Sequence, residues 1–440
     1  MYTYKEVQNT VFKLNGVHLK HCKNTADVAP IRMGTPKKVV IPMSMHIGAP
    51  AKPVVKAGDT VKVGQLIGES GAGLSSPIYS GVSGTVKKID ELITAAGTHI
   101  TTVVIEPDGL QTVHEDVNPP IVENREQFLE AVRKSGIVGL GGAGFPTVVK
   151  LSADTSKIDA IVVNGAECEP YITSDTRTMI DEPDVIVDGL KMLMEYLEVK
   201  RVVVGIESNK KKCISALKRA IRGTDGIAVK ALPAVYPQGG EKVLVYHTVG
   251  RVIKEGQLPI DAGVIVINCT TVAAIAKYVR TGMPLVEKCV TVDGSAIAEP
   301  KNVIAPIGTP ALELIEFCGG FKAPARKILW GGPMMGIALP DLNMPVMKQT
   351  NAILAFDRKD ATPPEETACI KCGQCIEHCP LRLCPSEINK AYAAKDTAAL
   401  GKLKVNLCME CGSCSYVCPA KKNLVQTNKL AKAMLRNGGK

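Results

Sequence analysis

Two cysteine-rich stretches, CIKCGQCIEHCP at 369–380 and CMECGSCSYVCP at 408–419, decide how the last part of the chain folds. Each has the spacing Cys-x-x-Cys-x-x-Cys-x-x-x-Cys-Pro, which is typical of proteins that hold two four-iron clusters. In that pattern the first three cysteines bind one cluster and the fourth reaches the other. We therefore expect two [4Fe-4S] clusters, one on Cys369, Cys372, Cys375 and Cys418, the other on Cys408, Cys411, Cys414 and Cys379.

Structural zinc is the alternative interpretation of these cysteines. Zinc takes four ligands per site and needs no crossed fourth cysteine, so the duplicated motif favours iron–sulfur clusters.

The insert between the motifs, LRLCPSEINKAYAAKDTAALGKLKVN, is helical in composition and predicts a helical ferredoxin module. Cys384 lies outside both motifs, and we expect it to be a packed thiol. Two clusters carry single electrons, so the rest of the chain should supply one end of the electron path.

The composition is that of an ordinary globular protein. A length of 440 residues suits about three domains, and 45% hydrophobic with 22% charged residues excludes a mainly disordered chain. No stretch reaches the ~18 apolar residues of a membrane-spanning helix, and MYTYKEVQNTVFKLNG lacks an apolar signal core. We expect the chain to stay where it is made, in a reducing compartment where 15 cysteines argue against a disulfide framework.

The net charge of +10 raises the question of nucleic-acid binding. Aromatic residues make up only 4% of the chain, so base-stacking surfaces would be sparse. Each four-iron cluster with its thiolates carries about −2 and a flavin phosphate about −2, which leaves about +4 on the loaded protein. We expect no nucleic acid, and the remaining charge suits an acidic protein partner or a membrane surface.

The first predicted domain covers residues 1–115 and is rich in β-strands. Its halves GDTVKVGQLIGE (58–69) and SPIYSGVSGTVKKI (76–89) resemble the hammerhead of biotinyl and lipoyl carrier domains. Carriers modify a lysine in the turn between the halves, but no lysine occurs between Gln65 and Thr85. We therefore predict a hammerhead-like β-sandwich without a carrier function.

The remaining chain divides by its patterns into four parts. Residues 120–260 alternate apolar strands with helices, which predicts a central α/β domain with a parallel sheet, and Ser208 or Asn209 is expected to cap one helix. Residues 261–350 suggest a small β-grasp-like α+β module, 351–365 a linker, and 366–440 the helical two-cluster ferredoxin domain. The predicted fold class is thus multidomain α/β and α+β.

The stretch GLGGAGFPTVVK (139–150) matches G-x-G-x-x-G through Gly139, Gly141 and Gly144. A dinucleotide-binding loop of the Rossmann type follows a strand, but here a helix and a short IVG come first, so a standard Rossmann fold is not favoured. Glycines still let backbone amides approach a phosphate or a flat ring, and Lys150 adds a cation. A plain tight turn is the alternative interpretation.

Polar or glycine-rich residues also follow the predicted strands further along. VVNGAECEPYITSD places Glu167 and Glu169 two residues apart, so that both can face one crevice at the strand ends. YPQGGEK (236–242) and the polar run at 268–271 occupy similar positions. Solvated loop residues are the alternative for each stretch alone, but together they predict one composite nucleotide pocket.

The ordered stretches GLGGAGFPTVVK, NGAECEP, YPQGGEK and VINCTT resemble the flavin- and NADH-binding subunit of respiratory complex I. This sequence departs from that subunit by having two cluster motifs and no arginine in the glycine loop. Nearly the whole chain resembles the C subunit of the Rnf complex, through GVH (16–18), HIGAPAKPVVKAGD (46–59), GGPMMG (331–336) and both cluster motifs.

This resemblance implies a peripheral subunit on the cytoplasmic face of the membrane that binds FMN and NAD(H), with other subunits of an Rnf-type complex as partners and ferredoxin as an indirect one. It implies flavin contacts at Gly139, Gly141, Gly142, Lys150, Asn164, Tyr236, Gly240, Glu241 and Asn268, and a nicotinamide side at Phe145, Glu167 and Glu169. A flavin accepts hydride and releases single electrons, so no catalytic acid or base is required. A cobalamin reductase of the propanediol-utilisation type and an electron-relay subunit with a vestigial flavin site are the alternatives.

Overall fold

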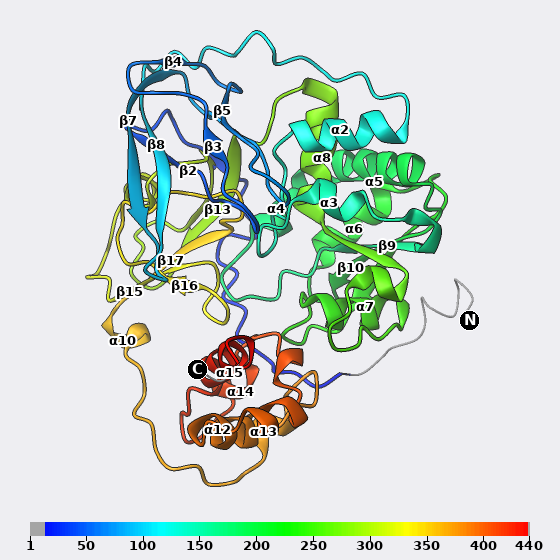
Figure 1. Ribbon diagram of the computed structural model, residues 1–440, viewed down its shortest axis with the longest axis vertical. Coiled ribbons are helices and arrows are strands. Elements are labelled where there is room, and N and C mark those ends of the chain that lie inside the picture. The colour runs from blue at the N-terminus through cyan, green and yellow to red at the C-terminus, as the bar shows by residue number, and fades with distance from the viewer. Residues whose placement is uncertain (1–13, 439–440) are drawn as a thin grey trace.

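The computed structural model describes residues 14–438, so the first predicted domain begins, and the last one ends, outside the described residues. Figure 1 shows a β-rich body in blue and cyan, an α/β body in green, a sheet in yellow and a helical body in orange and red. Among residues 14–438, none of the helices has the length and apolar character needed to span a membrane.

The β-rich body is a sandwich of two antiparallel sheets, in the strand orders β2-β8-β7-β4 and β3-β5-β6. Its core holds β-branched and methionine side chains such as Val39, Ile41 and Met43, which are every second residue of one stretch, as in a strand. Its strands are β2 (Val39–Pro42), β3 (Lys52–Pro53), β4 (Thr60–Val61), β5 (Leu66–Glu69), β6 (Ile78–Tyr79), β7 (Gly84–Ile93) and β8 (His99–Pro107).

The α/β body holds a four-stranded parallel sheet in the order β11-β10-β9-β12. Its strands are β9 (Ala160–Asn164), β10 (Val202–Glu207), β11 (Ile227–Leu232) and β12 (Val264–Asn268). Its helices are α2 (Arg125–Lys134), α3 (Thr147–Leu151), η1 (Thr155–Lys157), α4 (Ser174–Asp181), α5 (Pro183–Leu197), α6 (Lys211–Ala220), α7 (Glu241–Val249), η2 (Pro259–Ala262) and α8 (Cys269–Thr281). Helices α2, α5, α6 and α8 contribute to the core on one face of the sheet and α7 to the core on the other.

Two sequence predictions for this body are wrong. The domain does not end at residue 260, because β12 pairs with β9 along its whole length and α8 packs on α5. Helix α6 has Lys210 at its N-cap rather than Ser208 or Asn209, and no side chain caps it. The Asn209 amide instead contacts the His21 ring.

The yellow body is a mixed six-stranded sheet in the order β1-β14-β13-β17-β15-β16. It is larger than predicted, because β1 comes from the N-terminal segment and β17 from the predicted linker. Strand β17, AILAF, is fully apolar and buried, so the linker starts only after Phe356. The elements are β1 (Ile31–Arg32), β13 (Glu287–Asp293), β14 (Lys301–Pro306), α9 (Ala311–Phe317), β15 (Lys327–Trp330), β16 (Ile337–Ala338), β17 (Ala352–Phe356) and α10 (Arg358–Ala361).

The C-terminal body is helical, as the insert between the cysteine motifs predicts (Figure 1). Buried Ile388, Leu400, Val405 and Ala431 form its apolar core. Its helices are α11 (Gln374–Glu377), α12 (Pro385–Ala393), α13 (Thr397–Lys402), η3 (Val405–Leu407), α14 (Ser413–Tyr416) and α15 (Leu424–Arg436).

Candidate functional site

The glycine-rich loop is a closed turn before α3. The Gly139 N–H donates to the Phe145 carbonyl at 2.8 Å, and the Phe145 ring is half-buried. A Cβ added at Gly141 would lie 2.5 Å from Asn268 Nδ2, so the loop passes this amide where a larger residue has no room. A Cβ at Gly142 would have no other heavy atom within 4 Å, which leaves this backbone open to a ligand.

The predicted strand-end residues meet at one edge of the parallel sheet. Asn164 and Asn268 are register partners at the carboxyl ends of β9 and β12. The Asn164 amide donates to the Gly239 carbonyl at 2.9 Å, which brings the YPQGGEK loop to the same edge. The Asn268 amide donates to Asp175 at 2.8 Å. The carboxyl edge of a parallel sheet is where α/β proteins bind nucleotides.

Lys150 and Glu241 face each other beside this edge. The Lys150 ammonium donates to the Val266 carbonyl at 2.8 Å and lies 3.6 Å from the Glu241 carboxylate. Glu241 is the first residue of α7 and follows Gly240, its N-cap. A methyl group at Gly240 would overlap the Met409 side chain. The loop before α7 therefore lies in close contact with the helical C-terminal body.

Glu167 and Glu169 diverge, so the expectation that both face one crevice is wrong. The Glu167 carboxylate is buried and accepts hydrogen bonds from the Asp175 N–H at 2.8 Å and the Thr176 hydroxyl at 2.7 Å, and lies 3.3 Å from the Lys210 ammonium. It therefore caps α4 rather than facing a ligand. Two residues in an irregular loop need not share a face, because the side-chain alternation of a strand does not apply there.

Glu169 turns instead to the GGPMMG loop. Its carboxylate accepts the N–H groups of Met334 at 3.0 Å and Met335 at 2.8 Å. Burial raises its pKa to about 7, although these two N–H groups oppose the rise. At this pKa, Glu169 is present in both its protonated and its charged form near neutral pH.

Sequence reasoning missed Lys23, which fixes the loop that carries both glutamates. The half-buried Lys23 side chain donates through its ammonium to three carbonyls, those of Glu167 at 2.8 Å, Glu169 at 2.7 Å and Ile172 at 2.5 Å. Burial, and after it the charge of Lys210, lowers the Lys23 pKa to about 8. No local pattern marks this lysine, because its partners lie about 145 positions away.

Tyr236 joins the carboxyl edge of the parallel sheet to the second cysteine motif. Its buried hydroxyl donates to the Cys411 carbonyl at 2.7 Å. Its backbone forms a two-hydrogen-bond bridge with Val17, both bonds 2.9 Å long. The GVH stretch, the YPQGGEK loop and a cluster motif therefore meet at one residue.

The cysteines of the second predicted cluster line one small cavity, namely Cys379, Cys408, Cys411 and Cys414. Two donors point at their sulfurs, the Leu383 N–H at 3.3 Å from Cys379 Sγ and the Asn428 amide at 3.4 Å from Cys408 Sγ. Four soft sulfur ligands with N–H donors fit a four-iron cluster in the crossed assignment. As the side chains lie, no three His, Cys, Asp or Glu residues within 14–438 meet around a single metal ion.

The cysteines of the other predicted cluster lie in two environments. Cys375 and Cys418 are buried in one apolar cluster with Leu424, whereas Cys369 and Cys372 are exposed in an irregular segment. The crossed fourth ligand, Cys418, thus lies with Cys375 of the first motif. Cys384 is half-buried at the N-cap of α12 and does not line the cysteine cavity.

Comparison with known proteins identifies each body. The chain matches the RnfC barrel sandwich hybrid domain at residues 12–110, the Nuo51 FMN-binding domain at 132–277, the SLBB domain at 289–338 and the 4Fe-4S dicluster domain at 368–423. An FMN-binding domain and a dicluster domain in one chain define a flavin- and iron–sulfur-containing electron-transfer protein.

Sequence similarity to individual proteins identifies the family. The chain is 42% identical to the C subunit of the proton-translocating ferredoxin:NAD(+) oxidoreductase complex of Clostridium ljungdahlii, over 89% of this chain and 86% of that protein. It is 41% identical to the C subunit of the Na(+)-translocating complex of Acetobacterium woodii, over 87% of each. It is 39% identical to the C subunit of the ion-translocating oxidoreductase complex of Rhodobacter capsulatus, over 96% and 82%. The chain belongs to the family of Rnf complex C subunits.

A solved structure shares the fold. The NAD+-reducing [NiFe]-hydrogenase in the air-oxidized state aligns with a TM-score of 0.50 and 18% identity, over 72% of this chain and 63% of that chain. At this identity the likeness concerns the fold alone.

Proposed function

We propose that this chain exchanges hydride with NAD(H) through FMN and passes single electrons between FMN and two [4Fe-4S] clusters. It does so as the peripheral subunit, on the cytoplasmic face of the membrane, of an ion-translocating ferredoxin:NAD oxidoreductase. Its partners are the other subunits of that complex, and ferredoxin reaches it through them. The names of the relatives and the order of the matched domains support this proposal.

The observation that carries the proposal is the hydrogen bond between the Tyr236 hydroxyl and the Cys411 carbonyl. FMN, when bound, converts hydride chemistry into single-electron transfers. The chain must hold the flavin beside a cluster for that conversion to be useful. Tyr236 lies in the loop that shapes the flavin-binding edge and touches a predicted cluster ligand, so one side chain fixes the spacing between the two redox sites.

The flavin contacts that we propose gather at the carboxyl edge of the sheet, where open glycine backbone and strand-end amides meet. They are Gly139, Gly141, Gly142, Lys150, Asn164, Tyr236, Gly240, Glu241 and Asn268. We place the nicotinamide beside Phe145 and Glu169, because Phe145 closes the glycine loop and Glu169 lies between this edge and the GGPMMG loop. Glu167 is left out, since α4 and Lys210 already occupy its carboxylate.

The exposed segment around Cys369 and Cys372 is the side of the cluster domain that we assign to the partner subunits. Ile370 between them is 67% exposed, so this segment presents an apolar side chain that a partner subunit would cover. A partner that covers this segment would bring its own redox centre close to the first cluster.

The test is anaerobic reconstitution of the chain with FMN, iron and sulfide, followed by rapid mixing with NADH. We expect bleaching of the flavin band and then reduction of the clusters. Tyr236→Phe should slow cluster reduction relative to flavin reduction, whereas Tyr416→Phe, at an exposed position of the cluster domain, should not. A chain that binds FMN but never reacts with NADH would refute the proposal, and a chain that never binds FMN would favour an electron-relay subunit.

A further inference from the structure

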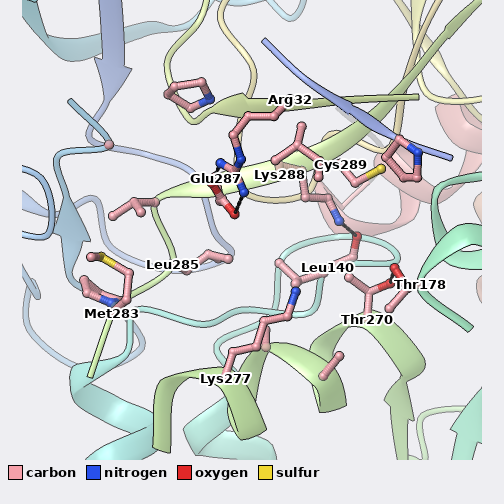
Figure 2. A pocket seen from close by; sticks show the side chains of 18 of the residues that line it. Arg32, Leu140, Thr178, Thr270, Lys277, Met283, Leu285, Glu287, Lys288 and Cys289 are labelled. Atoms are coloured by element: carbon pink, nitrogen blue, oxygen red, sulfur yellow. Dashed lines mark hydrogen bonds and ion pairs between the residues drawn. The ribbon is translucent and has the colours of Figure 1, made fainter. Parts of the chain in front are cut away.

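A large cavity, separate from the one that the cysteines line, lies where the sandwich, the α/β body and the six-stranded sheet meet. Its volume is about 650 Å³, within the range of sites for organic ligands. Residues of α8, β13 and the segment 30–35 line it (Figure 2). The residues proposed above to contact FMN or nicotinamide, all of which the structure describes, are not among its lining residues.

The walls of this cavity are mainly apolar. Ile137 precedes the glycine-rich loop and Leu140 lies within it. Met283 and Leu285 lead into β13, and α8 presents the short side chain of Ala274. A small residue on the helix leaves room that a larger one would fill. The body of a ligand that fits here is therefore apolar.

The charged residues that line the cavity, all of them within 14–438, are paired with one exception. Three ion pairs join lining residues to each other, namely Arg32–Glu287, Arg177–Asp181 and Lys277–Glu182. Figure 2 shows the first of these at the edge of β13. Each pair neutralises itself, so these six residues leave little net charge for a ligand.

Lys288 is the exception. Only 3% of its surface is exposed, and its ammonium makes one long hydrogen bond, 3.3 Å to the Leu140 carbonyl (Figure 2). Lys288 takes part in none of the ion pairs within 4 Å that the structure shows among residues 14–438, and the Asp175 and Glu167 carboxylates favour its charged form only from farther away. An ammonium has three donors, and leaving buried donors unused is costly. Burial lowers the Lys288 pKa, and a bound anion would favour its charged form.

We propose that this cavity binds an organic monoanion with a compact apolar body, whose acid group takes the free donors of Lys288. The site borders the flavin-binding edge, because Leu140 directly precedes Gly141 and its N–H is held by the Thr271 hydroxyl at 3.0 Å. A ligand on Lys288 would thus lie beside Leu140, a residue of the glycine-rich loop itself. The cavity is a place where an acidic small molecule can influence the flavin site without competing for it.

The test uses isothermal titration calorimetry on the reconstituted chain with two probes of the same shape, naphthalene-1-sulfonate and naphthalene-1-sulfonamide. We expect the anion to bind one site at least tenfold more tightly than the neutral amide. Lys288→Met should remove this preference, whereas Lys191→Met, on the exposed side of α5, should keep it. Equal binding of the two probes, or an unchanged preference in Lys288→Met, would overturn the proposal.

A second variant keeps the test decisive if Lys288→Met does not fold. Ala274→Phe fills the cavity from α8 without touching the charge. We expect it to abolish binding of both probes while the chain retains its FMN absorption band. If the anion binds to Ala274→Phe with the parent affinity, the probe does not bind in this cavity and the proposal is refuted.

Discussion

Lys23 shows how one half-buried side chain can determine the shape of a functional loop. Its ammonium serves three carbonyls of the stretch 167–172 at once. Lys23→Met would leave these acceptors without a partner, and we expect a loss of about 2–4 kcal/mol in the free energy of unfolding and a higher KM for NADH. Urea unfolding and steady-state kinetics measure the two effects.

The matched control for this prediction is Lys20→Met, because Lys20 lies exposed on the same segment. It should change stability by less than about 0.5 kcal/mol. Equal effects of the two variants would show that the Lys23 hydrogen bonds do not hold the loop.

The raised pKa of Glu169 predicts a pH dependence of stability. Its folded-state pKa is about 7, above the ordinary 4.5, so the folded chain binds the proton more tightly than the unfolded chain. This contribution is fully present below about pH 4.5 and is lost as the pH rises to about 7, on the order of 3 kcal/mol. Glu169→Gln should flatten the decline in unfolding free energy between pH 5 and 7.

Glu365→Gln provides the comparison for this pH effect, since Glu365 is exposed in the linker. It should leave the pH profile as it is in the parent chain. A Glu169→Gln profile with the parent slope would mean that another group is responsible for the pH dependence.

At the level of single residues, the sequence alone predicts the functional residues that belong to a recognisable motif. The cluster cysteines and the glycines of 139–144 stand out because spacing alone identifies them. Lys23, Asp175 and Lys288 do not stand out, because a lysine or aspartate acquires its role only from residues more than 90 positions away. The interpretation of Glu167 is wrong for another reason: the strand alternation does not hold in its irregular loop, and α4 and Lys210 occupy its carboxylate.

At the scale of elements, two neighbouring glycines of the glycine-rich loop provide a test and its control. Gly141→Ala would push a methyl group against the Asn268 amide, 2.5 Å away, and should cost about 1–3 kcal/mol. Gly142→Ala meets open space and should leave the unfolding free energy within about 0.5 kcal/mol. Thermal or urea unfolding of the two apo variants separates them, and equal stability would contradict the close approach of loop and strand end.

The crossed cluster assignment makes a prediction about pairs of elements. Cys379→Ser should lower the iron content from about eight to about four per chain, and Cys408→Ser should do the same. Because both residues line one cavity, the double variant should still hold about four irons. An uncrossed arrangement would instead leave the double variant almost without iron. Cys384→Ser, outside the cavity, should keep the full content measured by metal analysis.

Helices and strands are predictable where the apolar pattern is long and regular, as in β9, β10 and α5. The boundary at residue 260 is wrong because a strand reveals its sheet only through its partner, and β12 pairs with a strand about 100 positions earlier. The predicted start of the linker is wrong for a similar reason. AILAF is an apolar run, and no local signal shows that it pairs between β13 and β15.

For the whole molecule, Lys348 joins three bodies. Its side chain is fully buried and donates to the Pro77 carbonyl at 2.6 Å, the Gly136 carbonyl at 2.7 Å and the Ser76 hydroxyl at 3.2 Å. Lys348→Met should cost about 2–4 kcal/mol and split a shared unfolding transition into separate ones. Differential scanning calorimetry measures this, with exposed Lys327→Met as the control. An unsplit transition at the parent temperature would contradict the role of Lys348 as a joint.

The late pairing of the N-terminal segment affects how the chain folds during its synthesis on the ribosome. The Thr25 carbonyl accepts a hydrogen bond from Asn302, 277 positions later, and β1 pairs with β14 in the same region. At about 5–20 residues per second, this partner emerges roughly a quarter of a minute to a minute after the segment itself. During that interval the nascent segment has no strand to join. Newly made chains are therefore expected to depend on holding chaperones, and early truncations should be degraded rather than accumulate.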